Sequence, residues 1–440
     1  MSKKITHIYK RDGSLVPFEK DKVTRAIYKA AAEIGGHDLE LSQSLSDKVV
    51  AILENNLPKE IPSVEEIQDI VERVLITEGH DRTSKAFSAY RQKRKELRDK
   101  RHSGKVSHLP YKNAWETLWW NIDHSCETVE KLNAHVKNGT FPKLVSASER
   151  RYSEEISNIA LAVEEAKKRG VKVVLIAGPS SSGKTTTTDR VGKILGKRDI
   201  ELMKLNVDNY FYDKDQHLHD KYGDIDWEGP EALELPLINE HLKDLVEGKT
   251  IHVPRYDFKT GTRIKDQTDE LSVRSDQMIL IDSHYGLYDK LTESVPSGFK
   301  FGIYLEPLTQ LKRLNGDFVE WTDVRMLRRM IRDLLHREFD PTKTVGHWHY
   351  VRRGELKNII PYIENANYIF DTSMAYELPL LKHCLFAFMP STVEAYKNDP
   401  ERQDAYVRAK RVYRLLNEIE EWTGGDSVVP HNSIMREFIV

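Results

Sequence analysis

One segment limits the possible folds of this chain more than any other. The apolar run VKVVLIA (171–177) leads directly into GPSSSGKTTTTD (178–189), which combines two glycines, a row of hydroxyl residues and a lysine. A strand, a turn of small residues and a following helix form the unit from which parallel sheets covered by helices are built. The segment therefore predicts an α/β domain with a parallel sheet flanked by helices.

The residues after 171 continue this alternation of apolar strands and helical segments. We expect five strands, in VKVVLIAG, IELMKLNVD, QMILIDS, FKFGIYLE and ANYIFDTS. The alternation predicts that these strands are parallel and lie in one sheet. Residues 171–440 are thus predicted to form one α/β domain with a C-terminal helical extension.

The chain before this domain has a different character. Residues 1–100 read as a small, mainly helical domain that opens with a short hairpin and contains a capping box between Ser63 and Glu66. Residues 101–170 read as a helical connector, with helices in ETVEKLNAHVKNG and from about Ser153 to Lys168. A chain of 440 residues is too long for one ordinary core, which agrees with several domains.

Composition excludes several classes of protein. The net charge of −2 creates no overall field that attracts nucleic acid or anionic membrane. The two cysteines, Cys126 and Cys384, give neither a disulfide framework nor metal-ligand spacing. The sequence has no apolar run of about 18 residues and no signal-peptide core at its start. We expect a cytoplasmic homo-oligomer that binds neither nucleic acid nor membrane.

The segment after the first strand is a complete phosphate-binding pattern. Backbone N–H groups of small residues converge on phosphate oxygens, and the helix adds its positive dipole end. Lys184 is expected to reach the β- and γ-phosphates and the Thr185 hydroxyl to ligate Mg²⁺. The predicted cofactors are ATP and Mg²⁺, and the predicted cofactor-binding residues are Gly178, Ser180, Ser181, Ser182, Gly183, Lys184, Thr185 and Thr186.

Two further features suit phosphoryl transfer. Asp208 follows the second expected strand, so it should lie at the sheet edge where a carboxylate can accept the proton of an attacking hydroxyl. The helical segment VRMLRRMIRDLLHRE carries five arginines, a number that suits charge stabilisation over transferring phosphoryl groups. The alternative for Asp208 is a residue that caps a loop, and the alternative for the arginine segment is a surface helix with local salt bridges.

Several ordered motifs resemble the uridine kinase and phosphoribulokinase family of P-loop kinases. They are GPSSSGKTT, DNYF, IDWEGPEAL, VPRYDFKTGTR and RMLRRMIRD, from about Val171 to Ser373. A longer bacterial branch also shares VSASE, VRRGELKNIIPY and the ending VPHNSIMREFIV, which extends the resemblance from about residue 135 to the C-terminus.

The resemblance implies roles for particular residues. Asp208 matches the general base for a 5′-hydroxyl, and Asp226 matches the acid that binds the ribose diol. Tyr256 matches a residue near the base, and Arg263 belongs to the same substrate-binding motif. The lid arginines, which we expect to act in catalysis with Lys184 and Asp208, correspond to Arg329 and Arg332.

The chain departs from the family pattern in two places. Many uridine kinases read Glu-Gly-Ile-His after one strand, where this chain has Asp282-Ser283-His284-Tyr285, and Asp282 is expected to orient Mg²⁺ or its waters. In YDFKTGTR, Gly261 stands where the family commonly has a histidine that contacts the base. The second departure bears on the choice of base and not on phosphoryl transfer.

The N-terminal zone resembles an ATP-cone, the nucleotide-sensing domain of ribonucleotide reductases. The resemblance rests on IYKRDGSLVPFEKDKVTRAIYKA and LITEGHDRTSKAFSAYRQKRKEL, and it covers about residues 5–98. It implies that Lys10, Arg11 and Lys22 bind the phosphates of an ATP or dATP effector.

The expected function is ATP- and Mg²⁺-dependent phosphorylation of the 5′-hydroxyl of a ribonucleoside, uridine or cytidine first. A kinase of another small hydroxylated metabolite and a catalytically silent nucleotide-sensing regulator are the alternatives. For the basic run at 91–101 we prefer a solvated helix end over a nucleic-acid site, and for His347 and His349 a packing role over a metal pair. We expect Trp115, Trp119 and Trp120 to pack on a neighbouring element.

Overall fold

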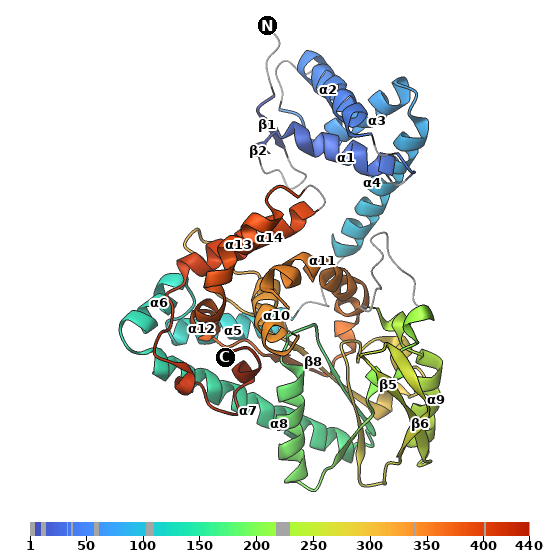
Figure 1. The fold of residues 1–440 in the computed structure, drawn as a ribbon, viewed down its shortest axis with the longest axis vertical. Coiled ribbons are helices and arrows are strands. Elements are labelled where there is room, and N and C mark those ends of the chain that lie inside the picture. Colours follow the sequence, from blue (N-terminus) through green and yellow to red (C-terminus); the bar gives the residue numbers. More distant parts are fainter. Residues whose placement is uncertain are drawn as a thin grey trace. The chain divides into compact units, whose positions relative to one another are not determined.

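The computed structural model describes residues 5–9, 15–32, 34–36, 38–56, 61–102, 110–216, 229–337, 339–399 and 402–439. Within them the chain forms two compact units, Met1–Val106 and Ser107–Val440 (Figure 1). Three residues with predicted roles, Lys10, Arg11 and Asp226, lie outside the described residues. None of the described helices is long and apolar enough to cross a membrane.

The first unit is a short hairpin followed by helices, as expected. Its elements are β1 (His7–Tyr9), β2 (Leu15–Pro17), α1 (Lys20–Ala32), α2 (Leu39–Asn56), α3 (Val64–Thr77) and α4 (Asp81–His102). The antiparallel strands pair with Ile8 opposite Val16. The predicted capping box is confirmed, since the Ser63 hydroxyl accepts from Glu66 N while the Glu66 carboxylate accepts from Ser63 N. One apolar cluster, with Ile27, Val49, Leu53 and Leu75 almost fully buried, forms the core.

The second unit is built on a five-stranded parallel sheet. Its strands are β4 (Leu202–Lys204), β7 (Met278–Asp282), β3 (Val173–Ala177), β8 (Lys300–Glu306) and β9 (Tyr368–Asp371), in that spatial order. All five strands expected from the sequence are confirmed. The predicted fold class, a parallel sheet flanked by helices, is confirmed as well.

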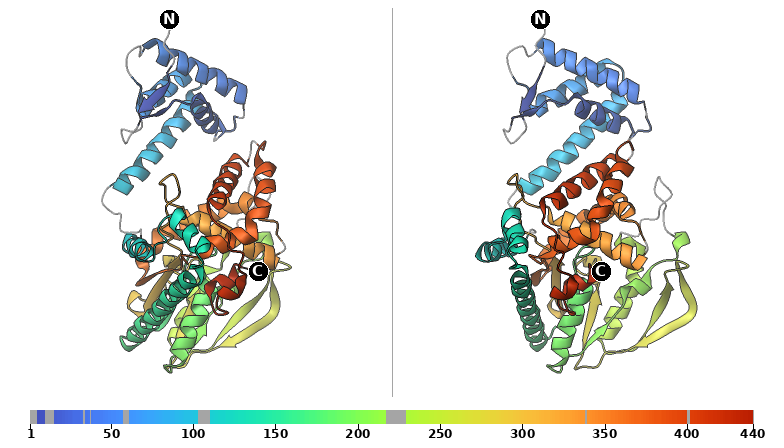
Figure 2. Two further views of the ribbon diagram at one scale, coloured as in Figure 1. Left: turned by 90° about the vertical axis from the view of Figure 1, so that its left-hand side faces the viewer. Right: turned by 60° about the vertical axis from the view of Figure 1, so that its left-hand side comes forward.

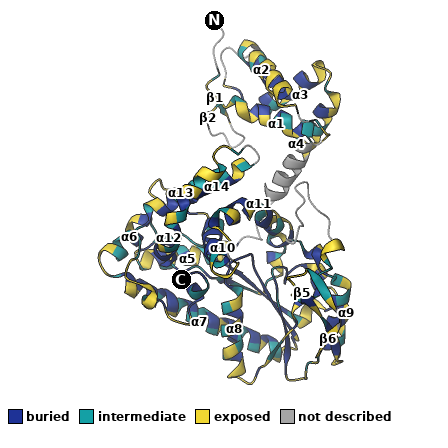
Figure 3. Cartoon of the chain, viewed as in Figure 1, coloured by how far each residue is buried: buried dark blue, intermediate teal, exposed yellow. Residues whose placement is uncertain are grey.

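Both faces of this sheet are covered, which explains why its strands read as continuous apolar runs. Alternate residues of β3 enter different cores: Val174 and Ile176 pack in one cluster with helices α7 and α8, and Val173 and Leu175 in another with α9. Figure 3 shows the buried residues concentrated in the sheet and in the helices against it. The central strand is thereby fixed on both sides, and so is the loop that follows it.

Helices make up most of the rest of this unit. They are α5 (Tyr111–Asp123), α6 (Val129–Lys137), α7 (Phe141–Lys168), α8 (Lys184–Gly196), α9 (Leu235–Val246), α10 (Trp321–Arg337), α11 (Pro341–Asn358), α12 (Glu377–Leu385), α13 (Met389–Tyr396) and α14 (Gln403–Glu418). The long α7 lies beside α8 in both views of Figure 2. The segment expected as a connector, 101–170, thus supplies α5, α6 and α7, which lie within this second unit and contribute to its core.

Two features of this unit were not expected from the sequence. Residues of the VPRYDFKTGTR motif form an antiparallel hairpin of β5 (Ile251–Asp257) and β6 (Thr262–Leu271). Of these three predicted tryptophans, Trp120 packs against neighbouring elements as expected: it lies against the larger core cluster, with the Arg151 guanidinium of α7 5.3 Å from its ring centroid. Trp115 and Trp119 are 62% and 56% exposed. The prediction that all three are packed is therefore wrong for these two.

Candidate active site

The phosphate loop connects β3 to α8 at the carboxyl end of the sheet. A Cβ on Gly178 would lie 2.3 Å from the Leu305 carbonyl oxygen, so only glycine fits between the loop and β8. Ser181 and Gly183 have φ values of 58° and 81°, in the left-handed region. These angles turn the chain so that the loop closes onto the first turn of α8, where N–H groups without helical partners favour an anion.

The loop is buried and held from behind. Ser180, Ser181 and Ser182 are 3%, 2% and 0% exposed. The Ser182 carbonyl accepts from the Thr372 hydroxyl at 2.7 Å, just after β9. Among the described residues, the buried hydroxyls of Ser181 and Ser182 have no hydrogen-bond partner. Polar atoms left in this way inside a glycine-rich loop suit a polar ligand such as phosphate.

Lys184, the first residue of α8, bends back over the loop. Its Nζ donates to the carbonyls of Gly178 at 2.8 Å and Pro179 at 3.2 Å, and lies 2.9 Å from Nδ1 of His284. Burial lowers the pKa of Lys184 to about 8, against the opposing effect of Asp282. Burial and the neighbouring Lys184 hold the pKa of His284 well below its usual range, so the imidazole is neutral.

Two predicted acids lie beside this loop. Asp282 ends β7, the neighbour of β3 in the sheet, and Asp208 lies in the 3₁₀ helix η1 (Val207–Tyr210) after β4. Asp208 faces solvent, yet partial desolvation and then the charge of Asp282 raise the pKa of its carboxyl. Lys204 Nζ is 3.4 Å from Asp282 and acts in the opposite direction on Asp208. The structure thus brings Lys184, Asp208 and Asp282 to one edge of the sheet.

Four of the five arginines of α10 fall into two groups, and the fifth, Arg337, is half exposed and pairs with Asp333 at 3.2 Å. Arg329 and Arg332, the predicted lid pair, both donate to the Ser180 hydroxyl of the loop, at 2.9 and 3.3 Å. Burial, then the charge of Arg329, lowers the pKa of Arg332 to about 10. The structure therefore places the predicted pair at the phosphate loop.

The other two arginines are fully buried. Arg325 donates to the Ser180 carbonyl at 3.2 Å and to the Glu355 carboxylate. Arg328 donates to Glu377 at 2.7 Å and to the carbonyl of Thr372 at 2.9 Å. Arg325 thus holds the phosphate loop from inside the core, and Arg328 holds the segment after β9.

Two of the residues predicted to contact the acceptor, Tyr256 and Arg263, lie on the β5–β6 hairpin. Tyr256 is buried and packs against Phe211 and Phe258, with ring centroids 5.7 and 5.0 Å away. Phe258 is 64% exposed. Arg263 donates to the carbonyls of Tyr210 and Phe211 and pairs with Glu234, so its guanidinium supports the segment after Asp208. Gly261 has a φ of 71°, and the Lys214 side chain lies against it.

The other predicted residues that the structure describes are Lys22, in the first unit, and His347 and His349 of α11. Lys22, near the start of α1, is exposed and pairs with Glu19 at 2.9 Å. His349 Nδ1 donates to the Gly346 carbonyl at 2.9 Å, and His347 packs on Tyr350. In the described residues, no group of three or more His, Cys, Asp or Glu side chains is arranged to hold a metal.

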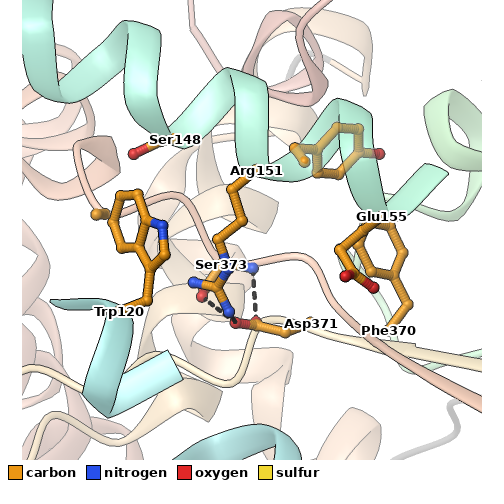
Figure 4. Close-up of a pocket in the computed structure, with 9 residues that line it drawn as sticks. Trp120, Ser148, Arg151, Glu155, Phe370, Asp371 and Ser373 are labelled. Atoms are coloured by element: carbon orange, nitrogen blue, oxygen red, sulfur yellow. Dashed lines mark hydrogen bonds and ion pairs between the residues drawn. The ribbon is translucent and has the colours of Figure 1, made fainter. Parts of the chain in front are cut away.

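A small pocket lies between α5, α7 and the end of β9 (Figure 4). Arg151 crosses it and pairs with Asp371 at 3.3 Å, while Ser373 donates to the same carboxylate. Tyr152 shares a 2.6 Å hydrogen bond with Thr187 of α8. Arg151 and Asp371 thus pair with each other inside the pocket. The hydrogen bond of Tyr152 connects α7 to α8, the helix that follows the phosphate loop.

Four residues without a predicted role contact the predicted site: Lys204, Phe258, His284 and Glu437. Lys204 and His284 follow from the topology, because parallel neighbours end at the same sheet edge. Phe258 was visible in the YDF motif as an aromatic residue beside Tyr256. Glu437 accepts from Thr186 N at 2.9 Å across a separation of 251 residues, which no local pattern signals.

Comparison with protein families divides the chain in the same way. Residues 6–96 match the ATP cone domain. Residues 173–378 match the Phosphoribulokinase / Uridine kinase family.

Individual proteins resemble each part separately. A vitamin B12-dependent ribonucleoside-diphosphate reductase of Thermoplasma acidophilum is 45% identical over 102 residues, which are 22% of this chain and 13% of the reductase. A uridine kinase of Deinococcus deserti is 29% identical over 198 residues, 45% of this chain and 86% of that enzyme.

Among solved structures, a possible uridine kinase from Bacillus stearothermophilus is 18% identical and covers 50% of this chain and 98% of its own, with a TM-score of 0.34. The two sequence matches, with the phosphate loop at the end of a parallel sheet, show that the chain carries an ATP-cone domain followed by a domain of the phosphoribulokinase and uridine kinase family.

Proposed function

We propose that this protein transfers the γ-phosphoryl group of ATP to the 5′-hydroxyl of a ribonucleoside, uridine or cytidine first. One observation carries the proposal. Lys184 of the phosphate loop and the acids Asp208 and Asp282 lie close enough for Asp282 to shift the pKa of Lys184 and for both to shift the pKa of Asp208. A phosphate site and a candidate base for a hydroxyl therefore share one edge of the sheet. The likeness to uridine kinases supports a nucleoside as the acceptor.

In the proposed reaction, Asp208 takes the proton of the acceptor hydroxyl. The hydroxyl oxygen forms a bond to the γ-phosphorus while the bond from that phosphorus to the bridging oxygen breaks, leaving ADP. The raised pKa of Asp208 makes it a better proton acceptor than an ordinary aspartate. Lys184, Arg329 and Arg332 supply positive charge where the phosphoryl oxygens would lie.

A kinase of this type uses Mg²⁺ with its nucleotide, and the residues present suit that ion. Thr185 is the second residue of α8, and Asp282 ends β7, the neighbour of β3 in the sheet. The Thr185 hydroxyl and the Asp282 carboxylate are oxygen donors of the kind that Mg²⁺ prefers. When bound, the ion neutralises charge on the β- and γ-phosphates. We propose these two residues as its protein ligands.

For the acceptor side we propose that Asp226 binds the ribose diol and that the base stacks on the aromatic cluster of Phe211, Tyr256 and Phe258. The exposed ring of Phe258 suits stacking on a planar base. We place the reaction in the cytoplasm, where ATP and free nucleosides meet.

An ADP-release assay over a panel of acceptors tests this proposal. The panel contains uridine, cytidine, adenosine, guanosine, ribulose 5-phosphate and 2-phosphoglycerate. We expect the largest kcat/KM with uridine or cytidine. Turnover only with a sugar phosphate or phosphoglycerate would replace the acceptor and keep the kinase chemistry. No turnover with any acceptor would favour a silent nucleotide sensor.

We further propose that the ATP-cone domain adjusts this activity through ATP or dATP bound by Lys10, Arg11 and Lys22. Two nucleotide sites in one chain are the minimum for allosteric control. A coupling of about 1–3 kcal/mol, or roughly 5- to 150-fold in apparent affinity, is typical.

Titration of dATP at saturating ATP and uridine, with mass measured by light scattering, tests this control and the expected homo-oligomer. Triple replacement of Lys10, Arg11 and Lys22 by alanine should abolish the response. A wild-type rate and mass that both ignore dATP would remove the proposal.

A further inference from the structure

The C-terminal segment of the chain contacts the start of α8. In the 3₁₀ helix η10 (Ile434–Glu437), the carboxylate of Glu437 accepts from Thr186 N at 2.9 Å and also bonds to the Thr186 hydroxyl. Thr186 is the third residue of α8, so its N–H is one of the donors that the helix itself leaves without a partner. A carboxylate from the last residues of the chain thus caps the helix that begins in the phosphate loop.

The segment that presents Glu437 is firmly placed. Ile434, Met435 and Phe438 are fully buried in the larger core of this unit. Ile434 lies so close to the loop that a Cβ on Gly183 would meet its Cδ1 at 2.0 Å. The buried hydroxyl of Ser433 bonds to the Glu149 carboxylate. Glu437 is therefore held at the loop by the packing of its neighbours.

The N–H group from which Glu437 accepts is also expected to bind a phosphate. In a glycine-rich loop followed by a helix, the N–H groups of the first turn point at the bound phosphates. The Glu437 charge also acts on two cations expected to serve a nucleotide, Lys184 and Arg332. In this arrangement Lys184 bonds to carbonyls of its own loop. Two of the groups expected to hold phosphates, the Lys184 ammonium and the Thr186 N–H, are thus bonded to the protein itself.

We propose that Glu437 sets the nucleotide affinity of the phosphate loop by acting as an internal competitor of a nucleotide phosphate. This inference rests on the proposed function, because it requires ATP to bind at the loop. The carboxylate and a phosphate both accept from Thr186 N, and their negative charges repel, so the contact breaks when the nucleotide binds. The segment IMREFIV is thereby a part of the active site, and it lowers the affinity of the phosphate loop for the nucleotide.

Calorimetric titration of the full-length protein with ATP tests this inference. The chains are the wild type, Glu437→Gln, Glu437→Asp and the control Glu420→Gln, which removes an exposed carboxylate paired with Lys137 instead. We expect both Glu437 variants to bind ATP about tenfold more tightly, since a charge-assisted hydrogen bond no longer competes. The control should bind as the wild type does.

Unchanged or weaker ATP binding by the Glu437 variants, with measurable binding by the wild type, would overturn the inference and leave the proposed function standing. A lack of ATP binding by every chain, wild type included, would overturn both.

Hydrogen–deuterium exchange of the wild type decides the matter without a variant. At an ATP concentration that protects residues 178–186, residues 433–439 should exchange faster, because Glu437 releases Thr186. Slower or unchanged exchange there would contradict the competition.

Discussion

The two sides of the candidate active site are built differently. On the nucleotide side, Ser182 is fully buried, and fully buried arginines hold the loop from the core. On the acceptor side, Asp208 faces solvent and Phe258 is 64% exposed on a two-stranded hairpin. Under the proposed function, this contrast means that phosphate binding would depend on the core of the fold, whereas the choice of acceptor would depend on surface elements.

The largest expected effects separate the two sides by their kinetic signatures. Asp208→Asn should lower kcat by about 10²–10⁴ because a general base is lost, while ATP affinity stays unchanged. Lys184→Ala should lower kcat by about 10²–10³ and also weaken ATP binding, because its charge faces the phosphates. Steady-state kinetics and calorimetry measure both quantities. A near-wild-type kcat for Asp208→Asn would remove it as the base.

The second prediction distinguishes the buried arginines from the lid arginines. Arg328→Met should destabilise the protein by about 3–5 kcal/mol, because Glu377 would remain as an unpaired buried carboxylate. Arg329→Met should cost less stability, because its buried partner Asp333 still pairs with Arg337, while kcat falls since Arg329 lies at the loop. Urea denaturation with matched activity assays measures the pair. Equal losses of stability would show that the two groups do not differ in role.

A smaller effect concerns the acceptor side alone. Loss of one hydroxyl would leave the Asp226 carboxylate unpaired, at a cost of about 1–3 kcal/mol. Uridine should therefore be preferred over 2′-deoxyuridine by about 5- to 150-fold in kcat/KM, and Asp226→Ala should erase most of that preference. Equal kcat/KM values for the two nucleosides in the wild type would contradict a ribose-binding role.

The smallest expected effect is a pH dependence on the nucleotide side. The pKa of Lys184 is lowered to about 8, so its positive charge is present below that pH and lost as the pH rises through it. ATP affinity should therefore fall above about pH 8, by a few-fold. In Lys184→Arg the guanidinium stays charged, and any binding that remains should be independent of pH up to about 9. Calorimetry between pH 6.5 and 9.5 measures both, and a flat wild-type profile would contradict the role of this charge.

The sequence predicted the parts of the site that local patterns encode. The five strands were visible as apolar runs, and the phosphate loop was visible because glycine, hydroxyl and lysine residues stand at fixed spacing. The β5–β6 hairpin was missed. Burial alternates from Ile251 to Val253, as in a half-buried strand, but a bulge between Pro254 and Tyr256 interrupts the alternation. The exposed Trp115 shows that helical spacing of aromatic residues does not decide which of them are buried.

Contacts between distant parts of the chain could not be predicted in this way. The contact of His284 with Lys184 spans 100 residues, and that of Glu437 with Thr186 spans 251. Each contact depends on how several elements pack together, and the sequence of one segment does not predict that packing. Tertiary packing also explains why Arg325 and Arg328, which lie on the same helix as the lid arginines, are core residues.

Transfer of label from γ-³²P-ATP to uridine tests the central claim most directly. The claim is that phosphate held in the core is passed to a hydroxyl held at the surface beside Asp208. We predict that the wild type places the label on the 5′-monophosphate of uridine and that Asp208→Asn binds ATP but forms almost no labelled product. Label found only as inorganic phosphate, or labelled uridine monophosphate formed equally well by Asp208→Asn, would contradict the account.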